Sequence, residues 1–103
     1  MTQRTGFVLH VRPDKIDEYV SAHRNVWPEM LDALRSAGIR NYTIFRAGNS
    51  AFGYFEAEDL DFAAAFLEAQ EVNGRWQNAM ADLLEERVPD GGPPALEQIF
   101  RLD

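Results

Sequence analysis

Two side chains that can move protons lie one helical turn apart. Tyr19 and His23 are separated by four positions within a stretch of helical periodicity, so their rings project from the same face of that helix. Histidine has an unperturbed pKa of about 6.5 and can both donate and accept a proton near neutral pH. Tyr42, from a predicted strand, and Trp76, from a later helical stretch, can line the same pocket. These four side chains are therefore candidates for a site of acid and base chemistry.

The same spacing also fits an ordinary apolar core. Tyr19, Tyr42 and Trp76 lie among apolar residues, where aromatic rings are most often packing residues. A single histidine on an apolar face is also more often a hydrogen-bonded core residue than a ligand. His10, on a predicted strand, is expected to face across a sheet or into a subunit contact. Residue type and spacing alone leave both interpretations open.

Several other chemistries are excluded by residues that the sequence lacks. With no cysteine, the chain has no thiol nucleophile, no disulfide and no thiolate ligand for zinc. It contains neither a GxGxxG nor a GxxxxGK[ST] loop for phosphates, and no serine lies in a GxSxG elbow. Its two histidines, His10 and His23, do not form an HxxxH pair. We therefore expect no cofactor and no metal site.

The length and charge of the chain restrict its class. A chain of 103 residues predicts one domain, residues 1–103, whose core is small enough that oligomerisation is a natural expectation. The 10 basic and 17 acidic residues give a net charge of −7, which does not attract a polyanion, so no nucleic-acid partner is expected. No signal-like N-terminal segment and no run of about 18 apolar residues is present. These features predict a cytoplasmic protein with no membrane partner.

Hydrophobic periodicity predicts the elements that must position the candidate residues. A strand over 5–12 places Phe7, Leu9 and Val11 on one face. A helical stretch follows over 13–38, and Pro28 should break it near residues 24–27 because proline lacks an amide hydrogen. The remaining predicted elements are a hairpin of strands 39–47 and 51–57, helical stretches over 58–68 and 71–87 with a weak point at Gly74, a loop over 89–94 and a last strand over 95–102.

The predicted order is β-α-β-β-α-β, which is typical of the ferredoxin-like α+β fold. In that fold the helices cover one face of an antiparallel sheet. The other face would expose apolar side chains, which favours aggregation unless a partner covers it. We therefore expect two sheets to pack together in a symmetric homodimer.

Four stretches of the sequence together resemble the L-rhamnose mutarotase family, within the wider rhamnose and fucose mutarotase group. The most specific part is the pattern of Tyr19, His23 and Trp27-Pro28-Glu29, with Asn41-Tyr42 downstream. The resemblance implies a dimeric ferredoxin-like α/β barrel that interconverts the α and β anomers of a 6-deoxy-L-sugar without a cofactor. The four stretches cover nearly the whole chain: FVLHVRPDKIDEYVSAHRNVWPEM, GIRNYTIF, RWQNAMADLL and LEQIFRL.

The resemblance also implies roles for particular residues. The proton donor of the family falls on His23, and the sugar-contacting residues fall on Tyr19, Tyr42 and Trp76. Where the family often has a second tryptophan, this chain has Gln77, which we expect to bind substrate and which leaves L-fucose as an alternative to L-rhamnose.

His23 is the expected general acid for opening the sugar ring. Pro28 cannot donate a helical hydrogen bond to the carbonyl of Arg24. We therefore expect that carbonyl to accept a hydrogen bond from His23 and to select its tautomer.

Two other classes of protein remain alternatives to a sugar mutarotase. Cofactor-free monooxygenases have the same dimeric barrel and also use histidine, tryptophan and asparagine, but their flat apolar substrates need a drier pocket than a monosaccharide does. A binding module without catalytic activity is compatible as well, because a fold alone does not determine function.

Overall fold

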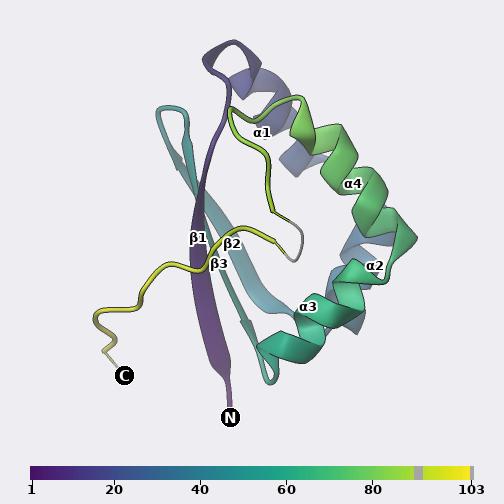
Figure 1. Ribbon diagram of the computed structural model, residues 1–103, viewed down its shortest axis with the longest axis vertical. Helices are drawn as coiled ribbons and strands as arrows, with labels where there is room; N and C mark the ends of the chain where they lie inside the picture. Colours follow the sequence, from purple (N-terminus) through teal and green to yellow (C-terminus); the bar gives the residue numbers. More distant parts are fainter. Residues whose placement is uncertain (90–91, 103) are drawn as a thin grey trace.

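An antiparallel sheet of three strands carries helices on one of its faces in the computed structural model, which describes residues 1–89 and 92–102 (Figure 1). The elements, in chain order, are β1 (Gln3–His10), the 3-10 helix η1 (Pro13–Lys15), α1 (Ile16–Arg24), α2 (Pro28–Ser36), β2 (Arg40–Ala47), β3 (Ser50–Ala57), α3 (Leu60–Glu68) and α4 (Glu71–Ala81). This arrangement confirms the predicted α+β class. No helix in the described part of the chain is long and apolar enough to cross a membrane.

The sheet has the strand order β1-β3-β2, in which β3 is the central strand. The β2–β3 hairpin was predicted correctly and turns at Gly48, whose φ of 60° is the left-handed conformation that glycine adopts at low cost. Phe7 on β1 lies opposite Gly53 on β3, and its ring occupies the space that a side chain at position 53 would need. Phe7 is buried as a result, on the side of the sheet that faces the helices.

The predicted break in the first helical stretch is confirmed. α1 ends at Arg24 and α2 begins at Pro28, which occupies the first turn, where an amide hydrogen is not needed. The carbonyl of Trp27 accepts hydrogen bonds from the amides of Met30 and Leu31 and so starts α2. The interruption leaves His23 in the last turn of α1.

The second helical region has the predicted gap between residues 68 and 71 and differs from its prediction in two other respects. α3 ends at Glu68 and α4 begins at Glu71, but the weak point expected at Gly74 does not interrupt α4. α4 also ends at Ala81, short of the predicted residue 87, and Leu84 forms a β-bridge with Val11. Helical periodicity continues through these residues, but burying Leu84 against the edge of β1 outweighs the local preference for helix.

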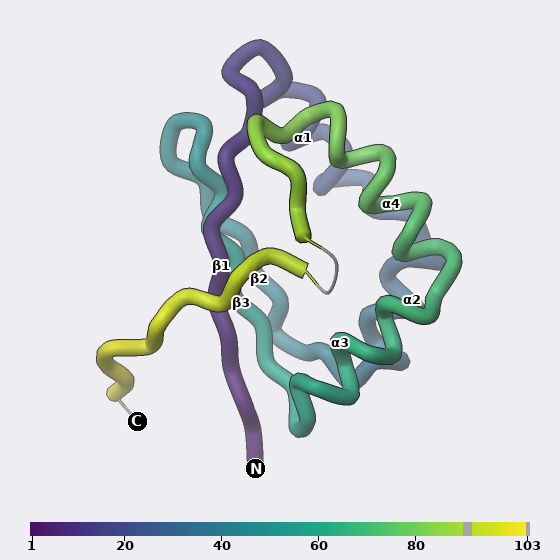
Figure 2. Tube along the Cα trace, viewed as in Figure 1, coloured from purple at the N-terminus to yellow at the C-terminus, as the bar shows by residue number. Residues whose placement is uncertain are grey.

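The predicted strand over 95–102 is wrong, because these residues have no strand conformation. The segment meets β1 through a hydrogen bond from the amide of Leu96 to the carbonyl of Gly6. At the end of β1, residues 83–85 pair with residues 10–12 and occupy that part of the edge. The chain then crosses β1 and continues away from the helices (Figure 2).

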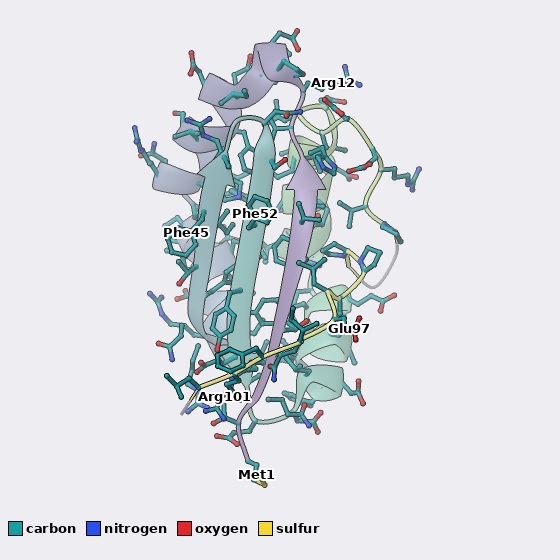
Figure 3. All side chains as sticks on the ribbon, turned by 90° about the vertical axis from the view of Figure 1, so that its left-hand side faces the viewer. Met1, Arg12, Phe45, Phe52, Glu97 and Arg101 are labelled. Carbon is teal, nitrogen blue, oxygen red and sulfur yellow. The ribbon has the colours of Figure 1, made fainter. Side chains whose placement is uncertain are left out.

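The side of the sheet opposite the helices exposes aromatic side chains, and we call it the open face. Val8, Phe52 and Phe45 lie side by side across the three strands of this face, and Phe52 and Phe45 are 43% and 68% exposed. The C-terminal segment from Glu97 to Arg101 passes diagonally in front of the open face (Figure 3). The predicted uncovered sheet face is therefore present only in part, because this segment crosses it.

Candidate active site

His23 has a defined tautomer because its ring is hydrogen-bonded to its own helix. Nδ1 lies 2.8 Å from the carbonyl oxygen of Tyr19, one turn earlier in α1. A carbonyl only accepts, so Nδ1 donates and carries the hydrogen, which leaves Nε2 as the nitrogen with the lone pair when the ring is neutral. The expectation that the carbonyl of Arg24 accepts this hydrogen bond is wrong. The Tyr19 carbonyl is the nearer partner because positions four apart face each other in a helix.

Two of the candidate aromatic residues enclose the imidazole of His23. The Tyr19 ring lies with its centroid 4.2 Å from that of His23, and the Trp76 ring from α4 meets the imidazole edge-on at 5.5 Å. Tyr19 and Trp76 are almost fully buried, whereas His23 is partly exposed. The structure thus brings together three of the predicted site residues and keeps one of them accessible to solvent.

Trp27 is a fourth member of this group, and the sequence analysis gave it no role in the site. Its ring meets that of Trp76 edge-on at 5.2 Å, and the guanidinium of Arg75 lies 5.9 Å from the Trp27 centroid. Arg75 also forms an ion pair with Glu29 at 3.1 Å. The sequence signal for Trp27 was the Trp27-Pro28-Glu29 motif. Spacing does not reveal, however, that the break before Pro28 turns Trp27 toward α4. We call Tyr19, His23, Trp27 and Trp76 the aromatic cluster.

Burial lowers the pKa of His23, and the hydrogen bond to the carbonyl of Tyr19 opposes this effect only in part. The imidazole is therefore neutral at neutral pH, and Nε2 can accept a proton. Burial also raises the pKa of the Tyr19 hydroxyl, which keeps that group protonated as a hydrogen-bond donor. Within the aromatic cluster, His23 is thus the group suited to proton exchange.

Tyr42 lies on β2, on the side of the sheet that faces the helices. Its ring lies 6.3 Å from Phe7 and 5.1 Å from Phe55, measured between centroids. Although the side chain is 40% exposed, burial of its hydroxyl raises the pKa of Tyr42 strongly, and the nearby Tyr19 raises it further. Tyr42 is therefore expected to keep its hydroxyl protonated near neutral pH.

Gln77 lies outside the group that the other predicted residues form. Its side chain is exposed and donates to the side-chain oxygen of Asn73 at 3.4 Å, one turn earlier in α4. The neighbouring Trp76 points into the core instead, because successive residues of a helix lie about 100° apart. The predicted contact of Gln77 with substrate stays a prediction.

His10 lies away from the aromatic cluster. It is exposed, and Nδ1 lies 2.7 Å from a carboxylate oxygen of Glu86. Its position on β1 opposite Ser50 places it on the open face, as expected. Over residues 1–89 and 92–102, no three acidic or histidine side chains are grouped closely enough to hold a metal ion.

An open groove of about 400 Å³ lies beside α2 and α4 and includes Glu29, Glu71 and Arg75. His23 and Tyr42 do not line it. This groove is therefore separate from the residues predicted to act on a substrate.

In a small α+β protein, a histidine of defined tautomer enclosed by aromatic rings is a site at which an enzyme can transfer protons. Comparison with known proteins makes the assignment specific. Residues 4–102 match the family model for L-rhamnose mutarotase, so the chain belongs to the L-rhamnose mutarotase family. The family resemblance noted in the sequence is thereby confirmed.

Individual relatives are similar in sequence to this chain over nearly their whole length. The L-rhamnose mutarotase of Burkholderia cenocepacia is 40% identical, and the alignment covers 95% of this chain and 96% of the relative. The L-rhamnose mutarotase of Oceanobacillus iheyensis is 35% identical, with 98% and 99% covered. The crystal structure of L-rhamnose mutarotase from Formosa agariphila superposes with a TM-score of 0.77 at 26% identity, covering 98% of this chain and 99% of that one.

Proposed function

We propose that this protein is an isomerase that interconverts the α and β anomers of L-rhamnose, with His23 as the residue that exchanges protons with the sugar. The observation that carries this proposal is the hydrogen bond from Nδ1 of His23 to the carbonyl of Tyr19, which directs a basic nitrogen away from the helix in a chain of this family. Anomer exchange needs only proton transfer at two oxygens. One well-placed histidine can supply most of that chemistry.

The reaction opens and closes the sugar ring. When the bond between C1 and the ring oxygen breaks, its electron pair goes to the ring oxygen, which takes up a proton. The anomeric hydroxyl gives up its proton before this step, and its oxygen becomes the carbonyl oxygen as the ring bond breaks. Rotation about the bond between C1 and C2 then presents the other face of the aldehyde, and ring closure reverses both transfers.

His23 can serve both directions of this exchange. Its neutral Nε2 accepts the proton of the anomeric hydroxyl, and the imidazolium that results is the general acid that returns a proton to the sugar. Because the pKa of His23 is lowered, the imidazolium is a stronger acid than an ordinary histidine and gives up its proton readily. The raised pKa values of Tyr19 and Tyr42 keep both hydroxyls protonated, so we assign them to hydrogen bonds that orient the sugar.

The tryptophan rings suit the apolar side of a deoxy-sugar. L-rhamnose has a methyl group and C–H bonds that can pack on an aromatic face. Trp76 is fixed between His23 and Trp27, so a sugar that contacts its ring lies next to the imidazole. We therefore assign Trp76 to substrate contact and Trp27 to its support.

Saturation transfer between the α and β anomeric signals in the proton NMR spectrum tests this function directly. Exchange of L-rhamnose should be faster with the protein present than in buffer alone. L-fucose, measured in parallel, is the alternative substrate, and the faster of the two sugars identifies the preferred one. If neither exchanges faster, the mutarotase assignment is wrong; tryptophan fluorescence that still responds to sugar would then point to a binding module.

We also propose that the protein acts as a homodimer in the cytoplasm, with the open face at the contact. Phe45 and Phe52 expose large apolar surfaces there, and further exposed apolar side chains lie on the segment that passes in front of this face: Leu96, Ile99, Phe100 and Leu102. Burial of such apolar surface lowers the free energy of association by about 25 cal/mol per Å². Sedimentation velocity over a range of concentrations should detect a dimer, and a monomer at every concentration would exclude it.

A further inference from the structure

A β-bulge lies directly next to Tyr42. Arg40 on β2 pairs with Glu56 on β3, and Thr43 pairs with Tyr54. Two residues of β2, Asn41 and Tyr42, therefore stand opposite the single residue of β3 that lies between these pairs. Such an insertion bends the strand and changes where its side chains point, and bulges often occur beside active sites for that reason.

The backbone of Asn41 has a conformation that most residues avoid. Its φ is 53°, and in the described part of the chain it is the one residue other than glycine with a positive φ. Asparagine tolerates this left-handed conformation better than most residues because its short polar side chain can form local hydrogen bonds. A cost of this kind persists where the surrounding structure enforces it.

A hydrogen-bonded network on the open face enforces the left-handed conformation of Asn41. The side-chain amide of Asn41 donates to Oε1 of Glu56 at 2.9 Å, and the hydroxyl of Tyr54 donates to Oε2 of the same carboxylate at 2.5 Å. Arg4 donates to the oxygen of Tyr54 at 3.3 Å. These hydrogen bonds, first from Tyr54 and then from Asn41, lower the pKa of Glu56 and keep it ionised near neutral pH.

On the opposite face of the sheet, the bulge sets the position of Tyr42. The ring of Tyr42 lies against Phe55, with the centroids 5.1 Å apart, and edge-on to Phe7. Burial and then the proximity of Tyr19, a member of the aromatic cluster, raise the pKa of Tyr42. A change in the backbone at Asn41 would therefore move the one predicted sugar-contacting residue that the sheet supplies.

We propose that Asn41 and Glu56 are positioning residues for the reaction, because their hydrogen bond holds the bulge that turns Tyr42 to the side of the sheet that faces the helices. This inference rests on the proposed function and deepens it. It predicts that side chains on the open face, which cannot touch a sugar bound among the helices, nevertheless control the rate of anomer exchange.

Two substitutions of Asn41 separate the contribution of its side-chain amide from that of its backbone conformation. Asn41→Gly removes the amide but keeps a residue that adopts positive φ at little cost, whereas Asn41→Val also rejects that conformation. We expect kcat/KM for L-rhamnose to fall about threefold in Asn41→Gly and about tenfold or more in Asn41→Val, since a small misplacement of a contact residue costs this much or more. Glu56→Ala should resemble Asn41→Gly, and Glu56→Gln, which keeps an acceptor oxygen, should recover part of the loss.

Glu85→Gln is the matched control for the Glu56 variants. Asn49 donates to Oε1 of Glu85 at 2.9 Å, an amide–carboxylate pair of the same length at the other end of the β2–β3 hairpin. This pair has no bulge beside it and no predicted site residue next to it. Glu85→Gln should leave the exchange rate unchanged.

A double-mutant cycle distinguishes positioning from general damage to the protein. If Asn41 acts through Tyr42, the Asn41→Gly substitution should cost less than about 1.5-fold once Tyr42 is replaced by alanine. An equal loss with and without Tyr42→Ala, or no loss in either background, would overturn the proposal.

A spectroscopic readout keeps the test independent of activity. The ring signals of Tyr42 in a 13C-tyrosine spectrum, assigned with Tyr42→Phe, should shift in Asn41→Gly and in Glu56→Ala but not in Glu85→Gln. Unshifted signals in the first two variants would contradict the inference. If the wild-type protein catalyses no anomer exchange, the proposed function fails, and these signals alone still decide whether the network positions Tyr42.

Discussion

The two faces of the sheet perturb their titratable groups by opposite means. On the side covered by helices, burial lowers the pKa of His23 and raises those of Tyr19 and Tyr42, so each group prefers its neutral form. On the open face, hydrogen bonds from Tyr54 and Asn41 lower the pKa of Glu56 and stabilise its charged form. One sheet thus has a water-poor side suited to proton transfer and an opposite side on which hydrogen bonds to a charged carboxylate order the backbone.

Replacing His23 should give the largest effect and tests whether the chemistry belongs to the helix-covered side. His23→Ala should reduce catalysed anomer exchange about 10²- to 10⁴-fold, the usual contribution of a positioned acid or base. The NMR saturation-transfer assay with L-rhamnose measures this loss. His10→Ala is the control on the open face, because its imidazole is exposed and pairs with Glu86. Full activity in His23→Ala would remove this residue from the mechanism.

Crowding the helix-covered side should have the next largest effect, this time on stability. A side chain at position 53 would lie 2.1 Å from the Phe7 ring, so Gly53→Ala should lower the free energy of unfolding by about 1–3 kcal/mol. The matched control is Gly74→Ala in α4, where a side chain meets nothing within 4 Å and should add about 0.5–1 kcal/mol. Urea denaturation of both variants measures the difference. Equal stability of the two variants would mean that Phe7 is not held against Gly53.

The pH dependence of the reaction sharpens the contrast between burial and hydrogen bonding. Because the pKa of His23 is lowered, its neutral form persists below pH 6.5, and kcat/KM should fall only at a more acidic pH. In the same range the unfolded chain takes up a proton that folded His23 resists, so stability that is fully present above pH 6.5 declines as the pH falls. Rate profiles from pH 4.5 to 8 and melting temperatures of the wild type and His23→Gln test both effects. A midpoint above 6.5 for kcat/KM would contradict the assignment of His23 as a partly buried base.

The smallest effect on the folded subunit is expected on the open face. Phe45→Ser should change the stability of the isolated subunit by less than about 0.5 kcal/mol, because the ring is already largely exposed. The same substitution should weaken the proposed dimer, which sedimentation velocity would show as dissociation at higher protein concentrations. Unchanged association would place the contact elsewhere on the molecule.

The positions of the main elements followed from local patterns in the sequence. Alternating apolar residues in β1 identified the face that includes Phe7, and Pro28 identified the end of α1. Helical spacing also placed Tyr19 beside His23. These features depend on interactions between residues a few positions apart, which is the information that periodicity contains.

The predictions that were wrong failed because they depended on contacts between distant segments. The strand expected over 95–102 and the helix expected to continue to residue 87 each depended on contacts with distant residues. Leu84 leaves the helical pattern because it is buried against β1, where it bridges Val11. The same pairing occupies part of the edge that the last strand would have needed. Competition for one sheet edge is not visible in the pattern of either segment.

The sequence by itself determined the class of fold, the family and the residue types that the chemistry needs. Only the tertiary structure decided that the carbonyl of Tyr19 selects the tautomer of His23, that Trp27 joins the cluster and that Gln77 lies outside it. It also decided that Asn41 is held in a left-handed conformation by Glu56, 15 positions away. The physical reason is that periodicity is encoded by neighbouring residues, whereas hydrogen-bond partners and burial are set by which segments meet when the chain folds.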